Sequence, residues 1–209
     1  MLRLQMKCLL FTEIMLLMSC ASAYRNLQTY QGDADCLKKF QPKFTTNWFK
    51  ATVDVFGKHI GGLLLIKKMP DSSMRVNFMN ETGISFLDFE FHGSEFKVHN
   101  VMKALDKNAV INTLRKDFEL ILMDQINAVN SNSSERNQEV YYFFPENKEK
   151  VYFVTNMDCS TLLRVERTSK LKLMVEANFV NPDSNGVPDS VHISHFTFDM
   201  QITLKKLEL

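Results

Sequence analysis

The stretch Phe49–Phe91, FKATVDVFGKHIGGLLLIKKMPDSSMRVNFMNETGISFLDFEF, decides the fold class because its hydrophobic period is two and its turns are short. In FKATVDV the apolar side chains alternate with Lys50, Thr52 and Asp54, as in a strand with one buried face. Turn residues at Gly57, at 70–73 and at 80–83 then divide the stretch into four such runs.

A fifth run, EFKVHNV at 95–101, follows the turn at 92–94. Five consecutive strands with short connections predict an antiparallel meander. The second strand is apolar at every position from Leu63 to Ile66, which predicts that both of its faces are covered.

After the meander, the period changes to that of a helix over 106–123. Five apolar residues fall at helical spacing in a segment without Pro or Gly: Val110, Ile111, Leu114, Phe118 and Ile121. Asp106 stands where it could cap the start of this helix. Because the helix lies between two blocks of strands, its apolar stripe is expected to cover one face of a sheet.

The remaining chain returns to strands. They are predicted at 139–144, 150–155, 161–168 and 171–180, with one or two more in 190–207. We predict a polar loop over 124–138, an unstructured tether over 21–35 and a short helix over 36–40. The expected fold is mainly β (α+β), with about ten or eleven antiparallel strands and one or two helices.

At the amino terminus, residues 8–18 are apolar except for Thr12 and Glu13, and Arg3 and Lys7 precede them. A basic head before a short apolar run is typical of a secretory signal, and the run is too short for a spanning helix. Met6 is an alternative start, because it places Lys7 directly before the apolar run.

The sequence Leu17–Met18–Ser19–Cys20 resembles a bacterial lipobox. The resemblance implies cleavage before Cys20, a diacylglyceryl thioether on its sulfur and a further acyl chain, such as palmitate, on the new amino group. Such a chain would be stably anchored to a membrane, since two or more acyl chains suffice for that. The alternative is an ordinary secreted protein that is cut after the small residues at 20–23. We therefore divide the chain into a signal peptide at 1–19, an acylated tether with a short helix at 20–46, and one domain at 47–209.

Charge and composition narrow the function. The chain has 25 basic and 24 acidic residues, and loss of residues 1–19 leaves equal numbers of each. A net charge of zero argues against nucleic acid as a partner, because nucleic acid requires a basic surface. No phosphate-binding glycine loop or nucleophile motif is present, and we expect neither a cofactor nor a metal.

Four cysteines are present, and Cys8 lies in the signal peptide while Cys20 is the lipobox cysteine. Cys36 and Cys159 remain. In an exported protein they could form one disulfide, or they could be two isolated buried thiols. Sequence cannot tell whether their Cα atoms approach each other, and we favour isolated thiols.

The order of strands, turns and helix resembles that of the bacterial outer-membrane lipoprotein carrier and acceptor superfamily (LolA/LolB-like). Arg75–Phe78, Gly83 and Ile84–Phe86 match the third strand, the following turn and the fourth strand of that pattern, and 188–204 resembles its last two strands. The resemblance covers most of 47–206. It implies a curved, incomplete antiparallel barrel whose concave face is covered by helices and holds the acyl chains of another lipoprotein.

The resemblance further implies an outer-membrane-anchored, periplasm-facing, monomeric lipid-binding protein that acts as a chaperone in lipoprotein transport. The lipobox fits the acylated acceptor better than the soluble carrier. Its ligand-binding residues would lie on the alternating apolar faces and on the helix stripe: Val53, Val55, Leu64, Ile66, Val76, Phe78, Phe86, Ile111, Leu114 and Phe118.

One departure concerns the turn at 79–84. In the acceptor this turn carries a protruding leucine for the membrane, whereas here Thr82 takes that position beside Glu81. Met79 and Ile84 flank the turn and could replace the leucine, although strand alternation could equally bury them. We name Met79, Thr82 and Ile84 as the membrane-facing turn.

Two other functions are weighed. The first is a non-catalytic structural or interaction lipoprotein of the envelope with the same fold. The second, least favoured, is a hydrolase that uses Asp88 and Glu90, which share a strand face; they more simply form the wet side of a half-buried strand. His192 and His195 are three apart on a strand and so face opposite sides, which argues against a shared metal. We expect that the protein is not an enzyme.

Overall fold

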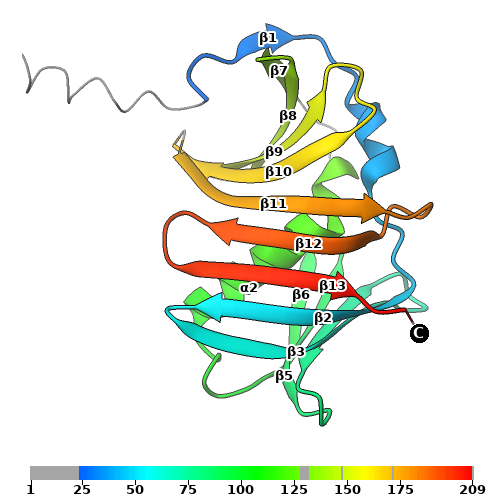
Figure 1. Cartoon of the computed structure of the whole chain (residues 1–209), viewed down its shortest axis with the longest axis vertical. Helices are drawn as coiled ribbons and strands as arrows, with labels where there is room; N and C mark the ends of the chain where they lie inside the picture. The colour runs from blue at the N-terminus through cyan, green and yellow to red at the C-terminus, as the bar shows by residue number, and fades with distance from the viewer. Residues whose placement is uncertain (1–23, 128–131, 147, 171, 209) are drawn as a thin grey trace, which may run out of the picture.

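The computed structural model of the chain describes residues 24–127, 132–146, 148–170 and 172–208. The predicted signal peptide and Cys20 lie outside these residues. In the described part the strands form one antiparallel sheet, which bends around a single α-helix (Figure 1). The strands are β1 Gln28–Tyr30, β2 Thr46–Val55, β3 Lys58–Lys68, β4 Met74–Met79, β5 Ser85–His92, β6 Glu95–Val101, β7 Asn132–Arg136, β8 Glu139–Glu146, β9 Glu149–Asn156, β10 Leu162–Ser169, β11 Lys172–Pro182, β12 Pro188–His195 and β13 Met200–Lys206.

The sheet is open. Its strand order is β1-β7-β8-β9-β10-β11-β12-β13-β2-β3-β4-β5-β6, so β1 and β6 are its edges in the described chain. Two meanders, β2–β6 and β7–β13, are joined because β13 pairs with β2, with Ile202 opposite Val53 and Leu204 opposite Ala51. This unclosed, mainly β sheet with its helix confirms the predicted fold class.

The helices are α2 (Asn108–Leu122) and two short 3₁₀ helices, η1 (Ala34–Phe40) and η2 (Asp124–Asn127). The predicted cap at Asp106 is wrong. The N-cap is Lys107, which makes no side-chain capping bond. Asp106 belongs instead to a tight turn, in which the amides of Leu105 and Asp106 donate to the carbonyl of Met102. It therefore lies one residue before the N-cap position.

The described residues form thirteen strands, two more than the upper number predicted. β1 falls in the segment predicted as a tether, and β7 falls in the segment predicted as a loop. The two pair with each other, with Thr29 opposite Ser134. Both are short and polar, so neither shows the alternation by which a strand is found in a sequence.

The prediction that β3 is covered on both faces is also wrong. Burial alternates along it: Gly62, Leu64 and Ile66 are buried, while Leu63 and Leu65 are only half-buried on the other side. The main core lies between α2 and the face of the sheet that the helix covers, which we call the inner face. A smaller cluster of Tyr24, Tyr141, Tyr152 and Val154 is separate from this core.

Candidate functional site

The inner face of β2–β5 is an apolar floor. Strand alternation places Leu64 and Ile66 of β3 and Val76 and Phe78 of β4 on it, and all four are buried. Neighbouring strands are in register, with Leu64 opposite Phe78 and Ile66 opposite Val76. The floor is therefore continuous from strand to strand.

Helix α2 covers this floor with its apolar stripe. Leu114 and Phe118 are buried and Ile111 is half-buried, as their helical spacing predicts. The Phe118 ring meets the Phe89 ring of β5 edge-on, with centroids 6.2 Å apart. One helix thus forms much of the cover over the inner face.

All ten residues predicted to bind a ligand belong to this one core or pack against it. Val53, Val55, Phe86 and Ile111 are half-buried, and the other six are buried. In β5 the fully buried residues are instead Leu87, Phe89 and Phe91, which sequence reasoning missed. Strand alternation could have identified them, because it places Phe86 on the same face as Asp88 and Glu90 and so leaves Leu87, Phe89 and Phe91 on the buried face. Whether any of these residues binds a ligand stays a prediction.

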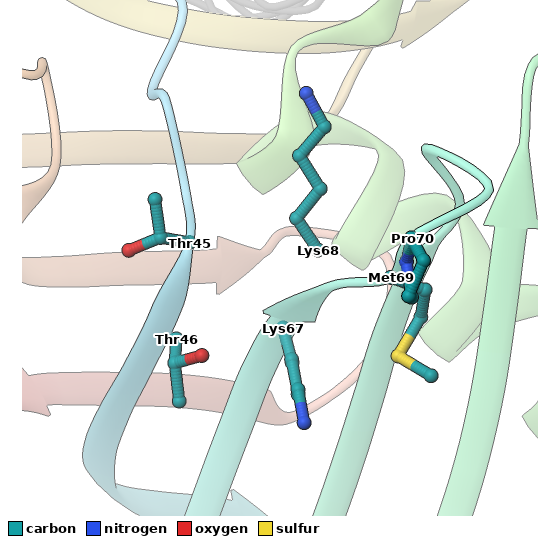
Figure 2. Close-up of a pocket in the computed structure, with 6 residues that line it drawn as sticks. All are labelled: Thr45, Thr46, Lys67, Lys68, Met69 and Pro70. Atoms are coloured by element: carbon teal, nitrogen blue, oxygen red, sulfur yellow. The ribbon is translucent and has the colours of Figure 1, made fainter.

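In this structure the buried side chains of α2 and of the floor belong to one core. The pockets that stand out in the described part of the chain lie elsewhere. One is open, at the ends of β2 and β3, with two lysines among its lining residues (Figure 2): Thr45, Thr46, Lys67, Lys68, Met69 and Pro70. The other has mostly polar lining residues around the β7–β8 turn. Neither lies between α2 and the floor, so neither is the predicted ligand site.

Charged side chains meet where α2 faces β9, β10 and β12. Asp117 of α2 is fully buried; its Oδ2 lies 3.0 Å from His195 Nε2 and its Oδ1 lies 3.7 Å from Arg167 Nη1. Arg167 also donates to the carbonyl of Lys116. Lys116 in turn donates to both carboxylate oxygens of Glu149, each at 2.8 Å. We call these five residues the α2 polar cluster.

Sequence reasoning missed this cluster. Asp117 lies next to Phe118 in the apolar stripe of the predicted helix, and Arg167 lies within the strand predicted at 161–168. In the sequence, each of these residues looks like an ordinary polar residue. Only the fold shows that they are partners. As predicted, His195 and His192 face opposite sides: the His195 side chain is buried under α2 and His192 is exposed. No group of three metal-type side chains occurs among the residues described.

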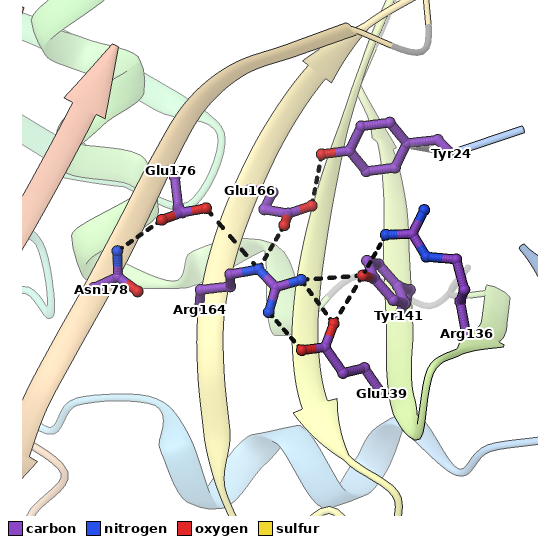
Figure 3. Close-up of polar contacts among 8 residues, drawn as sticks. All are labelled: Tyr24, Arg136, Glu139, Tyr141, Arg164, Glu166, Glu176 and Asn178. Carbon is purple, nitrogen blue, oxygen red and sulfur yellow. Dashed lines mark hydrogen bonds and ion pairs between the residues drawn. The ribbon is translucent and has the colours of Figure 1, made fainter. Parts of the chain in front are cut away.

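A second charged network surrounds Arg164 on β10 (Figure 3). Arg164 makes a bidentate pair with Glu139, at 2.9 and 2.8 Å, and donates to Glu166 at 2.6 Å. Glu166 accepts a 2.7 Å hydrogen bond from the Tyr24 hydroxyl. The hydrogen bonds from Arg164 lower the pKa of Glu139, and burial raises the pKa of Tyr24. This network fixes the first described residue of the chain to the sheet.

Cys36 and Cys159 are joined by a disulfide, with Cα atoms 6.4 Å apart. The expectation of two isolated thiols is therefore wrong. Cys36 lies in η1, and Cys159 lies in the turn between β9 and β10. The bond ties the amino-terminal segment to the β9–β10 hairpin.

The carboxylates of the hydrolase alternative are held by cations. Asp88 accepts two hydrogen bonds from Arg75, one of them 2.7 Å long. Glu90 lies 2.8 Å from His99 Nε2, and the hydrogen bond from His99 lowers the pKa of Glu90. A general acid needs a raised pKa, so this arrangement does not favour hydrolysis.

In the turn predicted to face a membrane, Asn80 Oδ1 accepts hydrogen bonds from the amides of Thr82 and Ile84 and from the Thr82 hydroxyl. This turn presents Ile84, which is 65% exposed, while Met79 is half-buried. Thr82 is exposed but its hydroxyl is used within the turn. Ile84 is therefore the apolar side chain that this turn offers, and its contact with a membrane stays a prediction.

No protein-family description matches the chain, and no curated protein matches it. Among solved structures, the chain is similar to a DUF1329 family protein from Desulfovibrio piger ATCC 29098, with a TM-score of 0.51 and 10% identity over 84% of this chain and 90% of that one. At this identity the likeness shows the fold alone.

The chain is also similar to a domain from Vibrio parahaemolyticus that is provisionally described as an outer membrane lipoprotein-sorting protein. The TM-score is 0.45 and the identity 8%, over 84% of this chain and 90% of that one. A TM-score below 0.5 is too low to support an argument about this chain. No helix among the described residues is both long and apolar enough to cross a membrane.

Proposed function

We propose that this protein binds acyl chains between α2 and the inner face of its sheet. In this proposal Cys20 anchors it to the outer membrane on the periplasmic side, and it assists the transfer or insertion of lipoproteins. The observation that carries the proposal is that a continuous apolar floor, built by several strands, is covered largely by one amphipathic helix. Binding would be driven by burial of apolar surface and would need no covalent chemistry.

Burial of an acyl chain offsets part of the cost of lifting α2, which includes separating its ion pairs with Glu149 and Arg167. Burying an acyl chain of about 16 carbons yields roughly 12 kcal/mol, at ~0.8 kcal/mol per methylene. Lifting α2 exposes Leu114, Phe118 and Ile121, at about 1.5–3 kcal/mol each. The ligand would also re-cover part of the floor that the helix leaves. The gain therefore exceeds the cost of displacing these side chains.

The connection before α2 is largely exposed, whereas the one after it is buried: residues 102–107 form a turn in which only Leu105 is half-buried, and Met123 lies in the core. Met123 has a left-handed backbone (φ 55°), which ends the helix at Leu122. Between these ends, the ion pair of Lys116 with Glu149 joins α2 to β9. A covalent bond at that ion pair would hold the helix closed.

We therefore expect that locking α2 to β9 blocks ligand uptake. In the Lys116→Cys/Glu149→Cys variant, bridging the two thiols with a short bismaleimide should lower the affinity for a fluorescent fatty acid by about tenfold or more, which is 1.4 kcal/mol. The unbridged variant is the first control, and fluorescence titration is the measurement.

A matched control places the same bridge away from the helix. Lys206 of β13 and Asp183 of the β11–β12 turn form an ion pair of similar length, 3.0 Å. Bridging Lys206→Cys/Asp183→Cys should leave the affinity unchanged. Equal effects of both bridges, or no effect of the first, would contradict binding under α2.

A second candidate is a non-catalytic structural lipoprotein of the envelope. The single core favours it, because the side chains of α2 and of the floor are already buried against one another. This function predicts no saturable fatty-acid binding by the unmodified chain. The titration above separates the two functions, since only acyl-chain binding predicts a saturable signal that the first bridge weakens.

A further inference from the structure

Two hairpin turns at one end of the sheet expose aromatic side chains. Phe56 in the β2–β3 turn is 69% exposed, and Phe196 in the β12–β13 turn is 52% exposed. The turns are neighbours, because the Phe56 amide donates to the carbonyl of Asp199 at 3.1 Å. Phe198 stacks on Phe56, with centroids 6.1 Å apart, and also contacts buried His195. We call Phe56, Phe196 and Phe198 the aromatic tip.

The backbone at Phe56 shows that this exposure does not serve the turn. Phe56 and Gly57 both have positive φ, 48° and 71°, as in a two-residue hairpin turn whose preferred first residue is Asn or Asp. A bulky residue in the left-handed region is a costly outlier. Phe56 thus departs from the local preference and exposes a large apolar surface, which points to a function for its ring.

The first described residues run away from the end of the sheet that carries the aromatic tip. Tyr24 stacks on Tyr152 of β9, and Gln28 pairs with Glu135, next to the β7–β8 turn at the opposite end. Residues 24–28 therefore run away from the end that carries the aromatic tip. In Figure 1 the described chain begins on the left, where the β2–β3 and β12–β13 turns also lie.

The tether before Tyr24 is short. Three residues separate Cys20 from Tyr24, so their Cα atoms lie at most roughly 14 Å apart when this segment is fully extended. Because Tyr24 is buried and bonded to Glu166, an acylated Cys20 would hold this end of the domain close to the bilayer.

We propose that the aromatic tip inserts into the lipid bilayer that holds the anchor, and so fixes the orientation of the domain on the membrane. This inference rests on the proposed lipid anchor but not on acyl-chain binding under α2. The two turns carry one cation, Lys58, and one anion, Asp199, whose charges cancel. We therefore expect membrane contact through the apolar rings, with a strength that does not depend on salt.

Fluorescence quenching tests the insertion. The chain has one tryptophan, Trp48. In a Trp48→Phe background, F56W and F196W each place an indole at the tip. V180W is the matched control, because Val180 is 38% exposed on β11 near the opposite end of the sheet. The acylated full chain is reconstituted in phosphatidylethanolamine–phosphatidylglycerol vesicles that contain nitroxide-labelled phosphatidylcholine, and intact mass and flotation report the anchor.

The expected result is roughly twofold quenching of F56W and F196W at low and at high salt, with little for V180W. Equal quenching at all three positions, or none at the tip of a chain that floats, would overturn the insertion and leave the function under α2 intact. A chain that carries no acyl groups and does not float would overturn the anchor and the insertion together.

A variant separates insertion from folding. Phe56→Asn suits the left-handed turn, so its melting temperature should equal or exceed that of the native chain. In the Trp48→Phe/F196W background, Phe56→Asn should reduce the quenching of the F196W indole. If a stable Phe56→Asn variant were quenched as before, Phe56 would have no part in insertion.

Discussion

Replacing Arg167 with methionine is expected to lower the free energy of unfolding by about 3–5 kcal/mol, because it leaves Asp117 charged and buried without its cation. Asp117 is fully buried, and Arg167 lies 3.7 Å from it in a nearly inaccessible position. His195, at 3.0 Å, remains as a hydrogen-bond partner of Asp117 and holds the loss below that of an isolated charge. Urea unfolding followed by circular dichroism measures the change.

The double variant Arg167→Met/Asp117→Leu is the control for this prediction. Apolar residues in place of a buried ion pair are often neutral or stabilising, so the double variant should recover most of the loss. The two single changes should therefore be strongly non-additive. Additive losses would show that the two side chains act independently and that the α2 polar cluster is not a unit.

Breaking the disulfide between Cys36 and Cys159 is expected to cost about 2–5 kcal/mol. The two cysteines are 123 residues apart, so the bond removes much conformational freedom from the unfolded chain. It also joins η1 to the β9–β10 turn, which means that its loss frees the amino-terminal segment first. Urea unfolding with and without reductant measures the effect.

The Cys36→Ser/Cys159→Ser variant should unfold at the lower urea concentration of the reduced protein and should not respond to reductant. Titration of the native chain under denaturing, non-reducing conditions should find neither of these thiols free. Free thiols at Cys36 and Cys159, or a native stability that reductant does not change, would contradict the disulfide.

Sequence predicted the parts of the fold that depend on local periodicity. The alternation in 49–91 gives β2–β5, and the spacing of Ile111, Leu114 and Phe118 gives α2 and its covered side. These patterns are readable because burial on one face repeats every two or every 3.6 residues. The candidate floor and stripe could therefore be named before the structure was known.

What sequence missed depends on contacts between distant residues. The pairing of β1 with β7, the bond between Cys36 and Cys159, and the approach of Asp117 to Arg167 each join segments that only the folded sheet brings together. None of them leaves a periodic pattern in the chain. Which side chains pack against one another in the core likewise depends on their volumes in three dimensions, which patterning does not contain.

The measurement that tests acyl-chain binding most directly is photo-crosslinking with a palmitate analogue that carries a diazirine at the end of its chain. After irradiation, mass spectrometry identifies the labelled peptides. The account predicts labels on the inner-face residues of β3, β4 and β5 and on α2, all suppressed by excess palmitate. Labels that excess palmitate does not suppress, or labels confined to outer-face residues such as those around Arg164, would contradict it.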